Sequence, residues 1–198
     1  MTRYEYDEDA SAEFRMDVVH EMDEATRAPA SRSDLKALGF QGFVPFAHLP
    51  AREVPTQEGV YAIVRPTGAR PEFLAENPSG RHKERNPTVP KHKLLDAWVD
   101  GVEVVYIGKA TAGAEGRRGL RKRLEEYRRH GTGEPVGHWG GRYIWQLADS
   151  AELLVAWLPT PDEDPGDVES RLIGAFTRQT GKLPFANLNR GRRGAGAT

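Results

Sequence analysis

Short runs of apolar, β-branched and aromatic residues predict the strands of this chain. Residues 59–64 (GVYAIV) and 102–110 (VEVVYIGKA) have the composition of two neighbouring strands. Residues 153–158 form a further strand candidate, and residues 140–150 (GGRYIWQLADS) form a weaker one. Residues 40–50 (FQGFVPFAHLP) are expected to be irregular apolar chain.

Helical spacing follows the second strand. Apolar side chains at Leu120, Leu124 and Tyr127 fall on one face of a helix that should end at Gly131. A later helix is expected to start at Gly166 or Asp167 and to run to about residue 180. Its inward-facing positions are Val168, Leu172, Ala175 and Phe176.

Two shorter helices complete the pattern. One should be capped by Asp34 and stop at Gly39, and the other should cover residues 93–99. The fold class predicted from these elements is α+β, with a small antiparallel-centred β-sheet flanked by helices. Residues 1–34 are predicted to be an N-terminal arm and residues 35–198 one domain, with a long insertion at about 65–100 between the first two strands.

Composition narrows the function classes. The chain has 198 residues and no cysteine, which excludes disulfides and thiolate zinc sites. The histidines show no close pair at zinc spacing, and Gly108-Lys109-Ala110 lacks the glycine and hydroxyl residue of a phosphate-binding P-loop. No secretory signal or membrane-spanning stretch is evident, so the expected location is cytoplasmic, without a membrane partner.

Charge is distributed unevenly. The net charge of the chain is -1, but residues 1–34 carry ten Asp or Glu against four Arg, so the remaining residues carry +5. Between residues 117 and 130 there are seven Arg or Lys against two Glu. Such a basic cluster favours a phosphate backbone, although a basic helix is often only a solvated face. The acidic arm is a candidate contact for a second copy or a partner protein.

Several short motifs occur in a fixed order. Gly59-Val60-Tyr61 and Tyr106-Ile107-Gly108 lie in the first two strands, and Leu120-Arg121-Lys122-Arg123-Leu124 opens the next helix. Glu169 and then Pro184-Phe185-Ala186-Asn187 follow. In this order the set resembles the GIY-YIG nuclease family, with Val60 in place of the family's isoleucine. Tyr61 and Tyr106 are 45 positions apart in the sequence. A long insertion between the two motifs resembles the restriction-endonuclease branch of the family.

The resemblance implies a role for each motif residue. It makes Tyr61 the group that activates or orients the attacking water and Arg123 the catalytic arginine, whose guanidinium matches phosphate oxygens. Arg121, roughly 160 to 200 degrees away around the helix, should face elsewhere. The full implied catalytic set is Tyr61, Tyr106, Lys109, Arg123, Tyr127, Glu169 and Asn187.

Glu169 is implied to be the only protein ligand of a metal ion. A single carboxylate with several waters suits Mg²⁺, or Mn²⁺ in its place. On its own, Glu169 reads as a charge near a helix N-terminus, which the helix dipole favours. The implied activity is hydrolysis of DNA that leaves 5′-phosphate and 3′-hydroxyl ends, in a restriction or defence role.

DNA is the predicted partner, and the insertion adds basic residues to the cluster in the helix. The candidate nucleic-acid-binding residues are Arg117, Arg118, Arg121, Lys122, Arg128 and Arg129, with Arg81, Lys83 and Lys91 from the insertion. The alternative left open is a catalytically inactive module with this fold that binds DNA or assists assembly.

Overall fold

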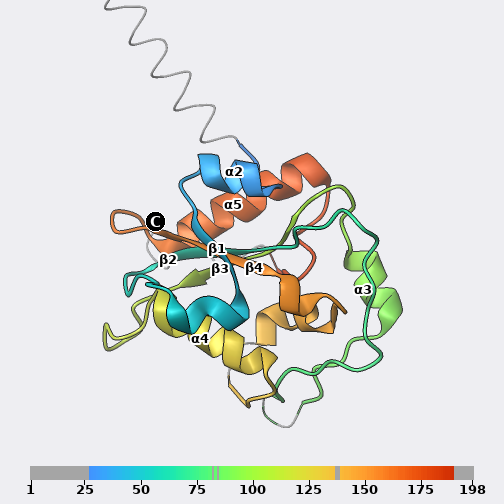
Figure 1. Cartoon of the computed structure of the whole chain (residues 1–198). Coiled ribbons are helices and arrows are strands. Elements are labelled where there is room, and N and C mark those ends of the chain that lie inside the picture. The colour runs from blue at the N-terminus through green and yellow to red at the C-terminus, as the bar shows by residue number, and fades with distance from the viewer. Residues whose placement is uncertain (1–26, 82, 84, 137–138, 190–198) are drawn as a thin grey trace, which may run out of the picture.

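The computed structural model describes residues 27–81, 83, 85–136 and 139–189 (Figure 1). Most of the predicted arm lies outside these ranges. Its last residues pack on the domain, because the Ala30 carbonyl accepts hydrogen bonds from the amides of Glu103 (2.9 Å) and Val104 (3.1 Å). No helix in the described ranges has the length and apolar character needed to cross a membrane.

A four-stranded antiparallel sheet forms the centre of the fold. Its strands are β1 (Gln41–Pro45), β2 (Gly59–Val64), β3 (Val104–Ala110) and β4 (Leu154–Pro159), in the order β1-β4-β2-β3. Helices α2 (Arg32–Ala37) and α5 (Pro165–Thr180) lie on one side of it and α4 (Leu120–Gly131) on the other (Figure 1). The predicted α+β class with an antiparallel sheet between helices is confirmed.

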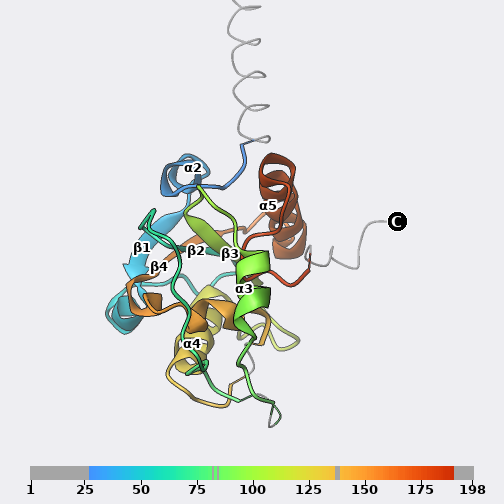
Figure 2. The ribbon, with the colours of Figure 1, turned by 90° about the vertical axis from the view of Figure 1, so that its right-hand side faces the viewer.

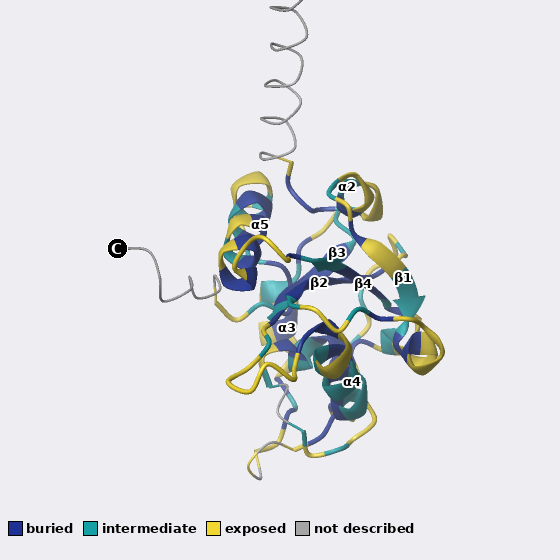
Figure 3. Cartoon of the chain, turned by 90° about the vertical axis from the view of Figure 1, so that its left-hand side faces the viewer, coloured by how far each residue is buried: buried dark blue, intermediate teal, exposed yellow. Residues whose placement is uncertain are grey.

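The sheet separates two apolar cores. The side chains of β2 point alternately into one core and then the other. Tyr61 and Ile63 belong to the core beneath α4, whereas Val60, Ala62 and Val64 belong to the core beneath α5. All six residues of β2 are therefore buried, and Figure 3 shows this strand in dark blue between the two helical layers. A continuous apolar run is what a strand covered on both faces requires.

Helix boundaries largely follow the sequence signals. α4 covers the predicted residues, and α5 begins at Pro165 because the Asp164 carboxylate accepts from the amides of Gly166 (2.7 Å) and Asp167 (3.2 Å). The predicted cap of α2 was wrong. Ser31 is its N-cap, and Asp34 is the reciprocal acidic partner three residues on, accepting from the Ser31 amide at 2.9 Å.

Two strand predictions were also wrong. The weaker candidate at 140–150 forms the 3-10 segments η2 (Trp139–Gln146) and η3 (Ser150–Glu152), with one isolated β-bridge between Leu147 and Phe73. Part of the chain at 40–50, expected to be irregular, forms β1 and the 3-10 helix η1 (Phe46–Ala51). Pairing with β4 holds β1 in place despite a bulge near Phe43, whose φ is 55°.

The long insertion between β2 and β3 is packed against the domain. It contains α3 (Lys91–Ala97), which faces the viewer in Figure 2, and Leu94 of this helix is buried in the core beneath α4. Arg65, 5% exposed, begins the insertion: its Nε donates to Asp149 at 2.7 Å and its Nη1 to the carbonyls of Thr67 and Ala69. The Gln146 amide binds both the N–H and the carbonyl of Val89 at 2.9 Å.

Asp149→Ala should lower the free energy of unfolding by about 3 kcal/mol, because it leaves the buried Arg65 guanidinium without its carboxylate. The matched control is Glu163→Ala, which breaks an exposed pair with Arg171 and should cost less than about 1 kcal/mol. Urea unfolding of both variants measures the difference. Equal stabilities would show that Arg65 does not anchor the insertion.

Candidate active site

Pairing of β2 with β3 brings the two motif tyrosines together. Tyr61 lies opposite Gly108, and Tyr106 lies opposite Ile63, so the two rings meet diagonally with centroids 6.0 Å apart. A Cβ on Gly108 would stand 2.6 Å from the Tyr61 hydroxyl and 2.8 Å from the Tyr106 ring. Only glycine fits beneath this pair.

The glycine of the first motif is equally constrained. A Cβ on Gly59 would lie 2.3 Å from the carbonyl oxygen of Leu158 and 2.9 Å from the Leu120 side chain. Gly59 thus lets β4 and the start of α4 approach the strand that carries Tyr61. Both motif glycines have a steric reason in this fold.

Arg123 reaches the tyrosines from α4. The pKa of Tyr61 is raised by burial, and the charge of Arg123 and hydrogen bonds with Tyr106 and Arg123 partly offset that rise. Arg123 also lies 3.5 Å from Glu126. Arg121 faces away, as the helical spacing predicts, with its Nε donating to the Val54 carbonyl at 3.0 Å.

Exposure differs sharply within this group. Tyr61 has no exposed surface, whereas the side chains of Lys109 and Arg123 are 29% and 28% exposed. Arg123 and Lys109 therefore form the accessible surface. Tyr61 is the buried partner that hydrogen-bonds to Arg123.

Tyr127 packs against the two motif tyrosines. It is fully buried, and its hydroxyl donates to the Gly141 carbonyl at 2.7 Å. Its ring packs edge-on against Tyr61 and Tyr106, with centroid separations of 6.2 and 5.7 Å. Burial raises its pKa well above the usual phenol value. These contacts place Tyr127 behind the other two tyrosines, where it holds their rings.

Glu169 and Lys109 meet on the opposite face of β3. Lys109 pairs with Val60, which belongs to the core beneath α5, and its Nζ lies 3.4 Å from the Glu169 carboxylate. Burial raises the pKa of Glu169, while Lys109 and Arg123 lower it. The Glu169 charge also raises the pKa of Tyr61, so the groups on the two faces interact electrostatically.

The donor set is compatible with one hard metal ion. Glu169 is a largely buried carboxylate beside a partly exposed lysine, and Mg²⁺ keeps much of its hydration when a protein supplies one or two carboxylates. Within the described ranges no group of three or more His, Asp or Glu side chains is arranged for a metal ion. Glu169 stays the candidate ligand for Mg²⁺ or Mn²⁺ that the family resemblance implies.

Asn187 fixes the backbone of the second motif. Its Oδ1 accepts from the Ile107 amide at 3.0 Å, and its Nδ2 donates to the Ile107 carbonyl at 2.8 Å. The Ala186 amide adds a hydrogen bond to the Val105 carbonyl at 2.8 Å. Asn187 therefore occupies the outer edge of β3 where a further strand would pair, and it positions Tyr106 and Gly108.

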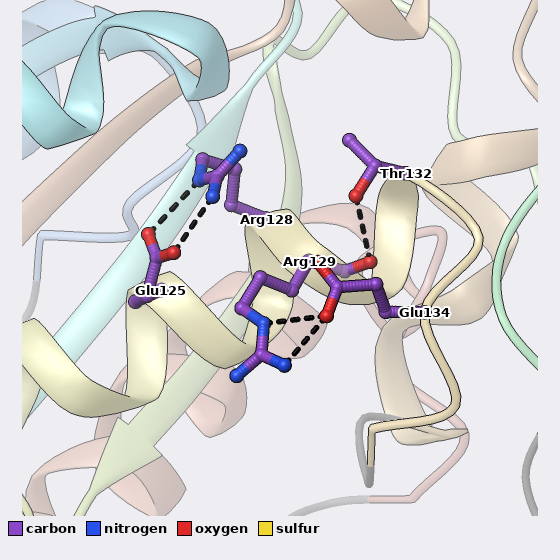
Figure 4. Close-up of polar contacts among 5 residues, drawn as sticks. All are labelled: Glu125, Arg128, Arg129, Thr132 and Glu134. Carbon is purple, nitrogen blue, oxygen red and sulfur yellow. Dashed lines mark hydrogen bonds and ion pairs between the residues drawn. The ribbon is translucent and has the colours of Figure 1, made fainter.

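Ion pairs reduce the predicted DNA-binding charge around α4. Arg128 binds Glu125 and Arg129 binds Glu134, each through Nε at 2.9 and 2.7 Å respectively (Figure 4). Arg118 binds Glu126, and Arg117 binds Glu115. Over residues 115–134 seven basic residues face four glutamates, for a net charge of +3. Lys122 and the insertion's Arg81, Lys83 and Lys91 are exposed.

The structure adds residues that the sequence did not single out. Gly141 accepts the Tyr127 hydrogen bond, and Glu126 contacts both Arg118 and Arg123. The glycine pair at 140–141 was the available signal, because a Cβ on Gly141 would lie 2.1 Å from the Tyr127 hydroxyl. Because residues 140–150 were interpreted as a strand, the contact between Gly141 and Tyr127 was not predicted.

Comparison of the chain with protein-family models, with curated proteins and with solved structures finds no match. The functional argument therefore depends on the site itself.

The tyrosine cluster makes a pH-dependent contribution to stability. The pKa values of Tyr61, Tyr106 and Tyr127 are all raised by burial, so the folded state keeps these protons above a pH of about 10, where an unfolded tyrosine loses its proton. The folded state then binds more protons than the unfolded state. Stability from this source is fully present below a pH of about 10 and is lost as pH rises through the folded pKa values.

Tyrosinate absorbance should show this directly. In the native protein at least three of the six tyrosines should titrate above the value of about 10 seen for the whole set in urea. A native titration curve that overlays the curve in urea would show that the cluster is not closed in solution.

Proposed function

We propose that this chain is a metal-dependent endonuclease that hydrolyses DNA phosphodiester bonds with GIY-YIG-type chemistry. The observation that carries the proposal is the meeting of five groups at the edge strand β3. Tyr61, Tyr106 and Arg123 lie on one face, and Lys109 and Glu169 lie on the other. Phosphodiester hydrolysis needs an oriented water, cationic charge near the phosphate and stabilisation of the leaving oxygen.

Each group has a defined task in the proposed reaction. Arg123 would donate hydrogen bonds to the non-bridging phosphate oxygens, and its contact with Tyr61 would hold its fork in place. An ordinary phenol is neutral at neutral pH, and burial raises the pKa of Tyr61 further. Tyr61 would therefore orient the attacking water by a hydrogen bond before any proton is transferred.

Glu169 and Lys109 would act on the opposite side of the strand. Glu169 would hold Mg²⁺ or Mn²⁺, which when bound supplies charge that stabilises the phosphate and the leaving oxygen. Lys109, 3.4 Å from Glu169, would turn its ammonium toward the DNA backbone. The resemblance to the family implies 5′-phosphate and 3′-hydroxyl products, and the long insertion implies a restriction or defence role.

A second candidate is an inactive DNA-binding or assembly module. Two observations favour it: Tyr61 has no exposed surface, and the Glu169 carboxylate already faces a lysine ammonium. Such a protein would bind DNA and leave every strand intact with either metal. The variants below separate the two candidates.

Arg123→Ala should lower the cleavage rate by roughly 10² to 10³, the usual cost of losing one electrostatic stabiliser. Arg121→Ala removes the same charge from the same helix and should lower the rate much less, because that side chain bonds the Val54 carbonyl. Tyr61→Phe should resemble Arg123→Ala. Nicking of supercoiled plasmid, with thermal melts to check folding, gives the comparison; equal rates for the two arginine variants would overturn the assignment.

Glu169→Ala should abolish cleavage and keep or tighten DNA binding, because it removes the metal ligand and also a negative charge beside the phosphate. Glu163→Ala is the control, since this exposed carboxylate lies just before α5 and pairs with Arg171. Cleavage and binding should be measured on the same preparations. A fully active Glu169→Ala protein would remove the metal site from the mechanism.

A further inference from the structure

The 3-10 segment η2 begins beside the tyrosine cluster. The Gly141 carbonyl accepts the Tyr127 hydroxyl at 2.7 Å, and a Cβ on Gly140 would lie 3.9 Å from the Tyr106 hydroxyl. In Figure 1 this segment belongs to the orange turns near α4, below the sheet. The start of η2 therefore packs against Tyr106 and Tyr127 of the tyrosine cluster.

Arg142 is held between two aromatic rings on this segment. Its guanidinium carbon lies 4.3 Å from the ring centroid of Trp139 and 5.1 Å from that of Tyr143. The buried side chain of Asn77 donates to the Arg142 carbonyl at 2.9 Å, which fixes the backbone from the insertion. Both the rings and the backbone thus orient the guanidinium before any ligand binds.

The polar environment of Arg142 differs from that of the α4 arginines. Arg118, Arg128 and Arg129 each bind a glutamate, whereas Arg142 has no carboxylate partner among the described residues. Its Nη1 donates to the Trp139 carbonyl at 3.2 Å, and burial lowers its pKa. With no second acceptor among the described residues, this partly buried cation has N–H donors available to a ligand that offers paired acceptors.

We propose that Arg142 is a specificity-determining residue that contacts a guanine next to the scissile phosphate. The inference rests on the proposed DNA hydrolysis. Guanine presents N7 and O6 as adjacent acceptors in the major groove, and a guanidinium fork matches that pair. Trp139 and Tyr143 orient the fork, and Gly140, two residues before Arg142, lies near the Tyr106 hydroxyl. If Arg142 only stabilised the fold, it would pack on the same two rings and would not select a base.

Sequencing the ends produced from a random-sequence plasmid library tests the proposal. Wild-type ends should share guanine at one fixed distance from the cut, and Arg142→Ala should lower that preference about tenfold or more. Arg142→Lys keeps the charge and loses the fork, so it should also lose the preference. Arg171→Ala, an exposed arginine on α5, should keep the wild-type profile. A profile unchanged in Arg142→Ala or Arg142→Lys, or a wild-type profile without guanine, would overturn the proposal.

A binding measurement separates this inference from the proposed hydrolysis. Fluorescence anisotropy in EDTA should compare random-sequence duplexes containing guanine with duplexes containing 7-deazaguanine, which lacks the N7 acceptor. Wild type should bind the guanine pool more tightly by at least about fivefold, and Arg142→Ala should not distinguish the pools. If wild type shows this preference and never cuts, hydrolysis fails and the inference stands. If wild type cuts and neither assay depends on Arg142, the inference fails and hydrolysis stands.

Discussion

The packing of Tyr61 over Gly108 sets the geometry on which the proposed site depends. Any side chain at position 108 would enter the space of both Tyr61 and Tyr106, so the absence of a Cβ decides how closely the two rings approach. Tyr61 then contacts Tyr127 and hydrogen-bonds Arg123. The pairing of Tyr61 with Gly108 thereby fixes residues of β2, β3 and α4. A small change at this pair would also shift Arg123.

The edge position of β3 would allow groups on its two opposite faces to serve one site, as the proposal requires. Successive side chains of a strand point to opposite faces, so Tyr106 projects toward α4 and Lys109 toward Glu169 of α5. In the middle of a sheet these groups would be separated by neighbouring strands. Asn187 bonds both polar groups of Ile107 at the open edge, which satisfies the backbone without adding a strand that would cover the site.

Local signals made much of the fold predictable. Residues 59–64, the helix from Leu120 to Gly131 and the opposite directions of Arg121 and Arg123 follow from periodicity and glycine placement. The 3-10 segment at 139–146 and the strand at 41–45 did not, because partners distant in sequence decide them. The cap of α2 is a local signal that the sequence reading assigned to the wrong residue, since Ser31 and Asp34 are only three residues apart. The glutamates that pair with Arg118 and Arg129 lie eight and five residues away along the chain, so a count of charge overstated the free positive surface.

The proposed site has a candidate for each group that phosphodiester hydrolysis requires, and the central claim of the proposal is that these groups act together on DNA. The most direct test is incubation of the purified wild-type protein with supercoiled plasmid in Mg²⁺, in Mn²⁺ and in EDTA. The account predicts nicked or linear DNA carrying 5′-phosphate ends with either metal and intact plasmid in EDTA. Plasmid that stays supercoiled under all three conditions, although the protein binds it, would contradict the account.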